Sequence, residues 1–286
     1  MESIPFVTIG IPLYNAEKFI ANTINSILIQ SYRDFELIIT DDGSQDNSLE
    51  IIKSFDDSRI KLIADGKNKG ISYRLNQQIS LARGKYFVRM DADDLMFPDR
   101  IQKQIDFLED NPDIEVLGSS VIVIDDYNKI IGFRKGVLLK DYEELFNKVL
   151  FNHPTVTGKL EYFKRYPYSE DLIGVEDADL WIRSFKESTF HVMEEPLLFY
   201  RDPLVFKLNT YLFRLKQKNK LLKQNNFLQN NKSLLYKLIL KNWLRKILAQ
   251  LLNFAKVDHI MITRRNKIDV TIDPQWKLIL KQFTDE

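Results

Sequence analysis

Short apolar runs alternate with segments of helical periodicity along the first 124 residues, and this alternation limits the fold more than any other feature of the sequence. Five runs rich in Val, Ile and Phe predict strands: Phe6–Ile11, Phe35–Thr40, Ile60–Ala64, Lys85–Met90 and Val116–Ile124. The segments between them predict helices, near residues 16–30, 47–55, 71–82 and 98–110. Strands separated by helices favour an α/β fold with a mostly parallel sheet, in which ligands bind beyond the carboxyl ends of the strands.

Acidic residues gather where such ligands would bind. Asp41–Asp42 follow the second predicted strand, Asp91–Asp94 follow the fourth, and Glu176–Asp177 begin a later predicted helix. A single group of this kind is usually a solvated turn or a helix start. Three carboxylates within four residues, however, repel one another, and a bound cation stabilises them. Carboxylate oxygens suit Mg²⁺ or Mn²⁺ shared with a diphosphate, so the sequence indicates a divalent-cation site.

Six segments, taken in their order and spacing, resemble family 2 glycosyltransferases of the GT-A fold. They are VTIGIPLYN (7–15), TDDGSQD (40–46), NKG (68–70), ARGKYFVRMDADD (82–94), HPTV (153–156) and EDADLWIR (176–183). The resemblance covers about residues 5–201. It implies a mixed, mostly parallel sheet flanked by helices, with a nucleotide-sugar donor lying across the strand ends.

The resemblance also implies which residues hold the donor. Pro12, Tyr14 and Glu17 match the segment that lines the nucleoside pocket. Asp42 matches the carboxylate that accepts a hydrogen bond from the base, and the uracil N3–H of a UDP-sugar would suit it.

Catalytic roles follow from the same resemblance. Asp91 and Asp93 match the DxD motif, which contacts the ribose and ligates Mn²⁺ or Mg²⁺. His153 and Glu176 fall on the acceptor side, and Asp177 matches the general base. A single base with direct displacement inverts the anomeric centre, whereas retention by double displacement would need a carboxylate nucleophile.

The implied function is an inverting, metal-dependent glycosyltransferase of surface polysaccharide biosynthesis. It would move one sugar to a hydroxyl of a glycan or of a polyprenyl-linked saccharide. The chain departs from the family twice. No His follows Tyr200–Arg201, where the family often has a metal ligand, which leaves Asp202 as a substitute. The QxxRW motif of processive synthases is missing, which favours transfer of a single sugar.

Two other functions remain open. One is a Mg²⁺-dependent phosphotransferase or phosphatase with Asp91 as the nucleophile, although the motif follows a matching nucleotide-sugar segment. The other is a catalytically silent, membrane-associated scaffold, which the retention of all four key aspartates disfavours. Two arginines, Arg74 and Arg100, fit either phosphate contacts or a solvated helix face.

Positive charge collects in residues 205–257, which hold twelve Lys and Arg but no Asp or Glu. This shift predicts a catalytic domain at 1–204 and a basic, mainly helical extension at 205–286. Apolar side chains recur at helical spacing between Lys232 and Val257. Such a helix either lies on an anionic membrane surface or packs on the catalytic domain or a second copy of the chain. Nucleic acid is a poor partner for a chain whose body is acidic.

Several classes are excluded by what the sequence lacks. It has no Cys, which removes disulfides, zinc thiolates and a thiol nucleophile. No apolar run reaches the roughly 18 residues of a membrane span, and the start does not resemble a signal peptide. We therefore expect a cytoplasmic protein, peripheral at the inner face of the membrane.

Overall fold

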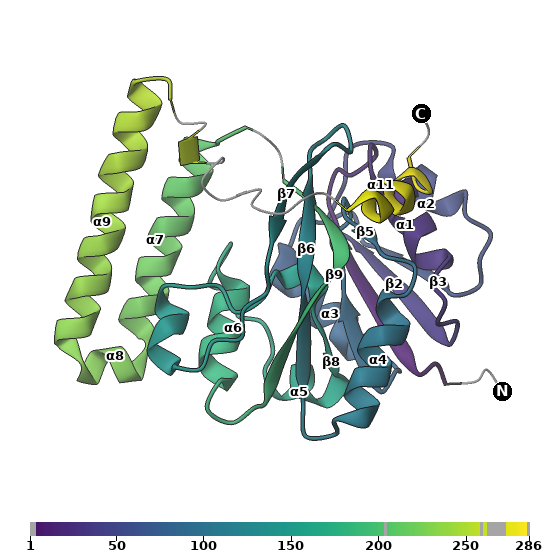
Figure 1. The fold of residues 1–286 in the computed structure, drawn as a ribbon, viewed down its shortest axis with the longest axis horizontal. Helices are drawn as coiled ribbons and strands as arrows, with labels where there is room; N and C mark the ends of the chain where they lie inside the picture. Colours follow the sequence, from purple (N-terminus) through teal and green to yellow (C-terminus); the bar gives the residue numbers. More distant parts are fainter. Residues whose placement is uncertain (1–3, 203–204, 258–259, 262–272, 285–286) are drawn as a thin grey trace.

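A mixed β-sheet forms the centre of the molecule in the computed structural model, which describes residues 4–202, 205–257, 260–261 and 273–284. Within these residues nine strands form one sheet, in the order β3-β2-β1-β4-β8-β6-β9-β5, with β7 paired to β6 (Figure 1). The strands are β1 (Val7–Leu13), β2 (Phe35–Asp41), β3 (Ile60–Ala64), β4 (Tyr86–Arg89), β5 (Leu95–Met96), β6 (Val116–Ile124), β7 (Ile130–Arg134), β8 (Thr157–Lys159) and β9 (Phe190–Arg201).

The first four strands of this order are parallel, and β6 also pairs in parallel with β9. The predicted sheet is therefore confirmed. Strand β1 runs past Pro12, where the sequence suggested an end, because the Leu13 carbonyl accepts a hydrogen bond from the Asp42 N–H at 2.7 Å. Because of this pairing, the carboxyl ends of β1 and β2 lie at the same edge of the sheet.

Four helices cover the parallel strands: α1 (Ile20–Leu28), α2 (Ser48–Lys53), α3 (Ile71–Leu81) and α4 (Arg100–Asp110). Apolar residues of α1 and α4 pack with β1, β2 and β4 in one core cluster, while α3 packs with Phe87 in another. Helices thus lie on both faces, as the alternation predicted. Helix α1 begins later than expected, because the amides of Ala16 and Glu17 bond to Ser48 and Asp46 rather than to a helical turn.

The chain after β7 adds a second group of helices. They include η1 (Tyr142–Phe146), η2 (His153–Thr155), α5 (Leu160–Arg165), α6 (Glu176–Ser184), α7 (Leu208–Gln224), α8 (Asn226–Asn230) and α9 (Lys232–Phe254), while α11 (Pro274–Lys281) packs near β5. Figure 1 shows α7 and α9 side by side beyond α6.

The predicted extension shares a core with the predicted catalytic domain. Leu221 and Leu222 of α7 and Leu228 of α8 belong to the same buried cluster as Trp181 of α6. The expected boundary falls on residues 203–204, which lie outside the described residues. The division into 1–204 and 205–286 therefore stays a prediction.

Helix α9 carries apolar side chains on two faces. One face packs toward α7 and buries Leu235, Leu238 and Ala249. The other leaves a stripe of apolar side chains exposed, named here the α9 stripe: Tyr236, Leu240, Trp243, Leu244, Leu248, Leu251 and Phe254. The single apolar face that the sequence suggested is thus two faces, one buried and one exposed. Among the described residues, none of the helices is long and apolar enough to span a bilayer.

Candidate active site

The polar clusters of the sequence converge at the carboxyl edge of the parallel strands. Asp42 follows β2, Asp91 and its neighbours follow β4, and Tyr14 follows β1, which lies between those two strands. Neighbouring strands are about 4.8 Å apart, so the Asp42 and Asp91 backbones stand roughly 10 Å apart along this edge.

Asp42 is held rigidly by the segment that precedes α3. Its carboxylate accepts hydrogen bonds from the Lys69 amide at 2.7 Å and the Gly70 amide at 3.0 Å. It also accepts from Nε of Arg74 at 3.0 Å. Gly70 has φ of +87°, which favours glycine and turns both amides toward the carboxylate. The Lys69 and Gly70 amides of the NKG motif therefore position the Asp42 carboxylate.

Arg74 corrects one sequence expectation. Its side chain is fully buried, and it pairs with Asp65 at 2.6 Å as well as with Asp42. A solvated helix face is therefore wrong for this residue. The periodicity of α3 could not reveal this, because the two carboxylates come from other segments of the chain.

The three residues expected around the nucleoside have different surroundings. Pro12 lies within β1, and Tyr14 is exposed just beyond it. Glu17 accepts hydrogen bonds from the backbone amide and side-chain amide of Asn47, both at 3.0 Å. Tyr14 is thus free to contact a ligand, whereas Glu17 holds the turn before α2.

The aspartates after β4 form one compact cluster. Asp91, Asp93 and Asp94 each offer a carboxylate oxygen within 4.8 Å of the others. Asp94 is fully buried, and its Oδ1 accepts from the Arg201 amide at 2.7 Å, while its Oδ2 has no partner among the described residues. Asp91 and Asp93 are more exposed. An orphaned buried oxygen beside two accessible carboxylates fits a hard divalent cation.

The carboxylates of this cluster repel one another. Burial and the charge of Asp91 raise the pKa of Asp93 to about 7. Burial and both neighbouring aspartates raise the pKa of Asp94 well above its usual range. A divalent cation would relieve this repulsion, because opposite charge favours the ionised form of each carboxyl.

Arg89, at the end of β4, is a site residue that the sequence analysis missed. It is buried, and its Nη2 lies 2.6 Å from Asp91 Oδ1. Its Nε and Nη1 have no hydrogen-bond partner among the described residues. Its charge lowers the pKa of both Glu176 and Asp177, so Arg89 acts on the acid pair as well as on the cluster. The only feature of the sequence that could have indicated Arg89 was its position at the end of a predicted strand, next to the DxD motif.

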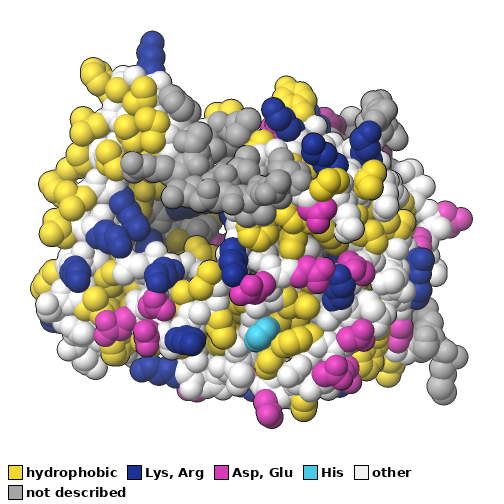
Figure 2. Space-filling view, viewed as in Figure 1, with side chains coloured by type: hydrophobic (Ala, Val, Ile, Leu, Met, Phe, Trp, Pro, Cys, Tyr) yellow, Lys and Arg dark blue, Asp and Glu magenta, His cyan; other side chains and the backbone are white. Residues whose placement is uncertain are grey.

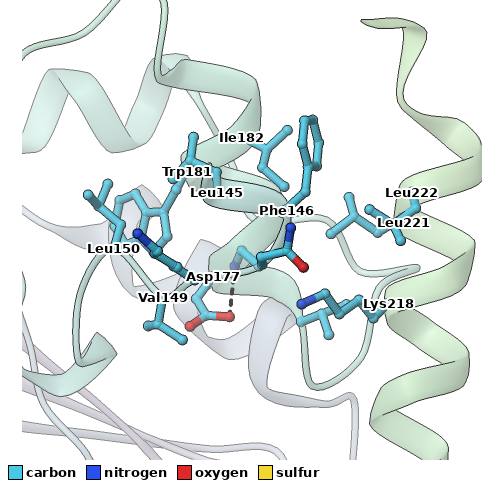
Figure 3. A pocket seen from close by; sticks show the side chains of 14 residues that line it. Leu145, Phe146, Val149, Leu150, Asp177, Trp181, Ile182, Lys218, Leu221 and Leu222 are labelled. Carbon is cyan, nitrogen blue, oxygen red and sulfur yellow. Dashed lines mark hydrogen bonds between the residues drawn. The ribbon is translucent and has the colours of Figure 1, made fainter. Parts of the chain in front are cut away.

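Glu176 and Asp177 begin α6. Burial and the charge of Asp177 raise the pKa of Glu176, and its Oε2 has no partner among the described residues. Burial also raises the pKa of Asp177, whose Oδ1 accepts from the Ala178 amide at 2.7 Å (Figure 3). Asp177 lines an open cavity, whereas Glu176 is buried. Of this pair, Asp177 is therefore the more accessible residue.

His153 lies in a wall of the site. Its ring is buried, and its Nε2 is 2.8 Å from the Tyr168 hydroxyl. Burial and the charge of Arg89 lower its pKa well below the usual range, which keeps the ring neutral. The structure thus gives His153 a side-chain partner within the protein.

Two further expectations need correction. Asp202 pairs with Arg134 and does not belong to the described metal-capable cluster. Arg100 is fully buried beneath the site, where its Nη2 donates to the Arg89 carbonyl at 3.2 Å. It therefore neither lies on a solvated helix face nor is accessible to a phosphate, the two alternatives that the sequence analysis left open. Burial lowers its pKa to about 9.

Helix α7 closes one side of the site, although the sequence assigned it to an extension. A cavity of about 440 Å³ beside Asp93 is lined by Arg214 and Tyr211 of α7. A second cavity of about 170 Å³ is lined by Asp177 and by Lys218 of α7. Only the tertiary contact between α6 and α7 brings these cations to the acids.

The mixed, mostly parallel sheet, flanked by helices and with acids at its carboxyl edge, is a GT-A fold. The sequence matches the model of glycosyl transferase family 2 over residues 8–182, so the chain belongs to that family and is a glycosyltransferase. It is 37% identical over 196 residues to "Putative glycosyltransferase EpsE" of Bacillus subtilis, covering 65% of this chain and 69% of that protein. It is 30% identical over 184 residues to "UDP-Glc:alpha-D-GlcNAc-diphosphoundecaprenol beta-1,3-glucosyltransferase WfgD" of Escherichia coli, covering 64% and 70%.

Solved structures share the fold at low identity. S. aureus TarS 1-349 in complex with UDP has a TM-score of 0.57 and 18% identity, covering 97% of this chain and 79% of that one. The mannosyltransferase PcManGT of Pyrobaculum calidifontis, solved with GDP-Man and Mn²⁺, has a TM-score of 0.56 and 17% identity, covering 78% and 64%. The fold predicted from the sequence is thus confirmed.

Proposed function

We propose that the protein is an inverting, metal-dependent glycosyltransferase that moves one sugar from a UDP-sugar to a hydroxyl of a lipid-linked saccharide in surface polysaccharide synthesis. The observation that carries this proposal is the compact carboxylate cluster of Asp91, Asp93 and Asp94 on the strand edge that also bears Asp42. The UDP-glucose and diphosphoundecaprenol in the name of the E. coli relative support this donor and acceptor.

In this mechanism each residue has a distinct task. Asp42 accepts a hydrogen bond from the base, and Tyr14 contacts the nucleoside. Asp177 removes the proton of the acceptor hydroxyl as it attacks the anomeric carbon from the face opposite the diphosphate. A raised pKa suits a general base, because the ionised carboxylate then binds the proton more strongly.

Asp91 and Asp93, with Asp94 behind them, would hold the Mn²⁺ or Mg²⁺. The bound ion supplies positive charge that offsets the charge developing on the leaving diphosphate. Asp42, Asp91 and Asp93 remain the residues that bind and orient the donor.

Replacing Asp93 with Asn should weaken Mn²⁺-dependent binding of UDP by at least tenfold in calorimetry, because one ligand loses its charge. Without the cation the variant should not be less stable. The folded state raises the pKa of Asp93 from 3.8 to about 7, so the free-energy penalty for ionising it grows between those pH values and is complete above about pH 7. Asn removes that penalty. The matched control is Asp99→Asn, at the start of α4 and outside the cluster. An unchanged Mn²⁺-dependent isotherm for the Asp93 variant would count against metal ligation there.

An anionic membrane surface is the second partner that we propose. Beside the α9 stripe, a groove of about 830 Å³ between α7 and α9 has an apolar floor and a rim of lysines: Lys216, Lys220, Lys223 and Lys246. Figure 2 shows hydrophobic side chains over the outer side of α9, with Lys and Arg nearby. Apolar side chains flanked by lysines suit the boundary between acyl chains and anionic headgroups.

Replacing three leucines of the α9 stripe (Leu240, Leu244 and Leu251) with Ser should lower binding to phosphatidylglycerol-containing vesicles by about tenfold to a hundredfold in sedimentation. Deleting residues 205–286 is a poorer test, because α7 and α8 contribute to the core. The control replaces three exposed apolar residues elsewhere with Ser: Leu81, Tyr127 and Val137. Unchanged vesicle binding, together with conversion of a dimer to a monomer in light scattering, would make the stripe a subunit interface instead.

A further inference from the structure

A small cavity lies between η1, α6 and α7, directly beside the proposed base. Its volume is about 170 Å³, and its walls are mostly apolar, with Leu145, Phe146, Leu150, Trp181, Leu221 and Leu222 among them (Figure 3). An apolar cavity of about 150 Å³ is large enough to admit benzene. This cavity therefore has room for one short branched hydrocarbon unit, but not for a long chain.

Two polar groups of the cavity have no hydrogen-bond or ion-pair partner among the described residues. The indole Nε1 of Trp181 is buried and makes no hydrogen bond to a described residue. The ammonium group of Lys218 reaches from α7 toward Asp177 of α6 (Figure 3). Within the described part of the chain, no carboxylate lies within ion-pairing distance of it. A buried donor is normally satisfied, so the orphaned Trp181 N–H, with the half-buried Lys218 ammonium at the same cavity, indicates a ligand with acceptor oxygens.

The surroundings of Lys218 are strongly positive. Burial and the charges of Arg245 and Lys241 on α9 lower its pKa to about 8, and only the more weakly acting charge of Asp177 opposes them. Arg214, one turn earlier on α7, lies over Gly174, just before Glu176–Asp177. Because residues 205–257 contain no Asp or Glu, helices α7, α8 and α9 have no carboxylate side chain of their own to neutralise this charge. An anionic ligand group would.

We infer that this cavity binds the acceptor through a phosphate-bearing lipid: the hydrocarbon unit next to the phosphate enters the cavity, and Lys218 contacts the phosphate. The inference rests on the proposed function, since it needs Asp177 to face the acceptor. It names a site that holds the lipid end of the acceptor while the sugar hydroxyl lies at Asp177. It also gives α7 a direct part in substrate binding.

The test uses the full-length protein and three soluble probes in EDTA, which prevents a metal-bridged diphosphate at the aspartate cluster. Geranyl diphosphate carries both chain and diphosphate, geraniol carries only the chain, and inorganic pyrophosphate carries only the diphosphate. In calorimetry geranyl diphosphate should bind at least tenfold more tightly than either fragment. Lys218→Gln should weaken it by about tenfold or more, the loss of one charge-assisted hydrogen bond, and should leave geraniol binding unchanged.

Two more variants complete the design. Lys53→Gln, an exposed lysine at the end of α2, should change nothing. Val149→Trp, at a largely exposed position of the cavity wall, should reduce binding of geranyl diphosphate and geraniol alike without unfolding the protein. Equal affinities for geranyl diphosphate and pyrophosphate would show a simple anion site and overturn the inference. An unchanged affinity of the Lys218→Gln variant for geranyl diphosphate would also overturn it. If Mn²⁺-dependent UDP binding persists in either case, the proposed function survives and only the lipid site fails.

Discussion

Replacing Asp177 with Asn should lower turnover by about 10²–10⁴-fold, the usual contribution of a general base, while the affinity for the donor changes by no more than a few-fold. The amide cannot accept the proton of the acceptor hydroxyl. Donor binding should persist, because Asp42 and the aspartate cluster lie on other elements. Release of nucleoside diphosphate in the presence of acceptor measures the first effect, and calorimetry with UDP and Mn²⁺ measures the second.

The matched control is Asp171→Asn, an exposed residue in the loop before α6. The wild-type pH profile provides an independent readout. Burial raises the pKa of Asp177, and the base must be ionised, so activity should fall on acidification at a pH above the ordinary aspartate range. An Asp177 variant with near wild-type turnover would remove its assignment as the base.

Replacing Arg89 with Met should have the second-largest effect, because this buried cation pairs with Asp91 and its charge also acts on Glu176 and Asp177. Its loss leaves Asp91 without its ion-pair partner at 2.6 Å. Removing one partner of a buried pair costs about 3–5 kcal/mol, and the partial exposure of Asp91 reduces this to about 2–3 kcal/mol in the free energy of unfolding at pH 8. Turnover should fall at least a hundredfold, since the remaining carboxylates repel one another.

The pH dependence separates this role from simple packing. Carboxyls that lose a nearby cation have a higher pKa in the folded state, so their ionised forms destabilise it and protonation removes the penalty. The stability difference between wild type and variant should therefore shrink between about pH 8 and about pH 6. Arg89 lowers the pKa of Asp177, so the pH below which activity falls should be higher in the Arg89→Met variant than in the wild type.

Denaturant unfolding at each pH measures the first effect, and Arg33→Met, an exposed arginine, is the control. The groups whose pKa responds to the charge of Arg89 come from several elements: Asp93, Asp94, Arg100, His153, Tyr168, Glu176 and Asp177. A stability difference that does not depend on pH would show that Arg89 acts only through packing.

The locally encoded parts of the site were open to prediction from the sequence. Strands β1 to β4 follow from runs of β-branched residues, and the acids after them sit at a shared edge because parallel strands end together. The positions of Asp42 and the aspartate cluster needed only that rule. Helix boundaries were less accurate, since Ser48 and Asp46 bind the amides that would have begun α1.

Contacts between distant segments were not open to prediction. We expected Arg74 and Arg100 either to contact phosphates or to lie on a solvated helix face, yet both are buried among partners that include residues of other elements. The apolar residues of α9 read as one face, whereas packing against α7 divides them into a buried and an exposed face.

By itself, the sequence determined the first four strands with the helices between them, the acids at the strand ends and the family to which the chain belongs, because periodicity and motif spacing are local properties. Only the tertiary structure decided that the charge of Arg89 acts on both acid groups and that α7 brings Arg214 and Lys218 to them. Those relations depend on which surfaces of distant segments bury each other, and no local pattern encodes that choice.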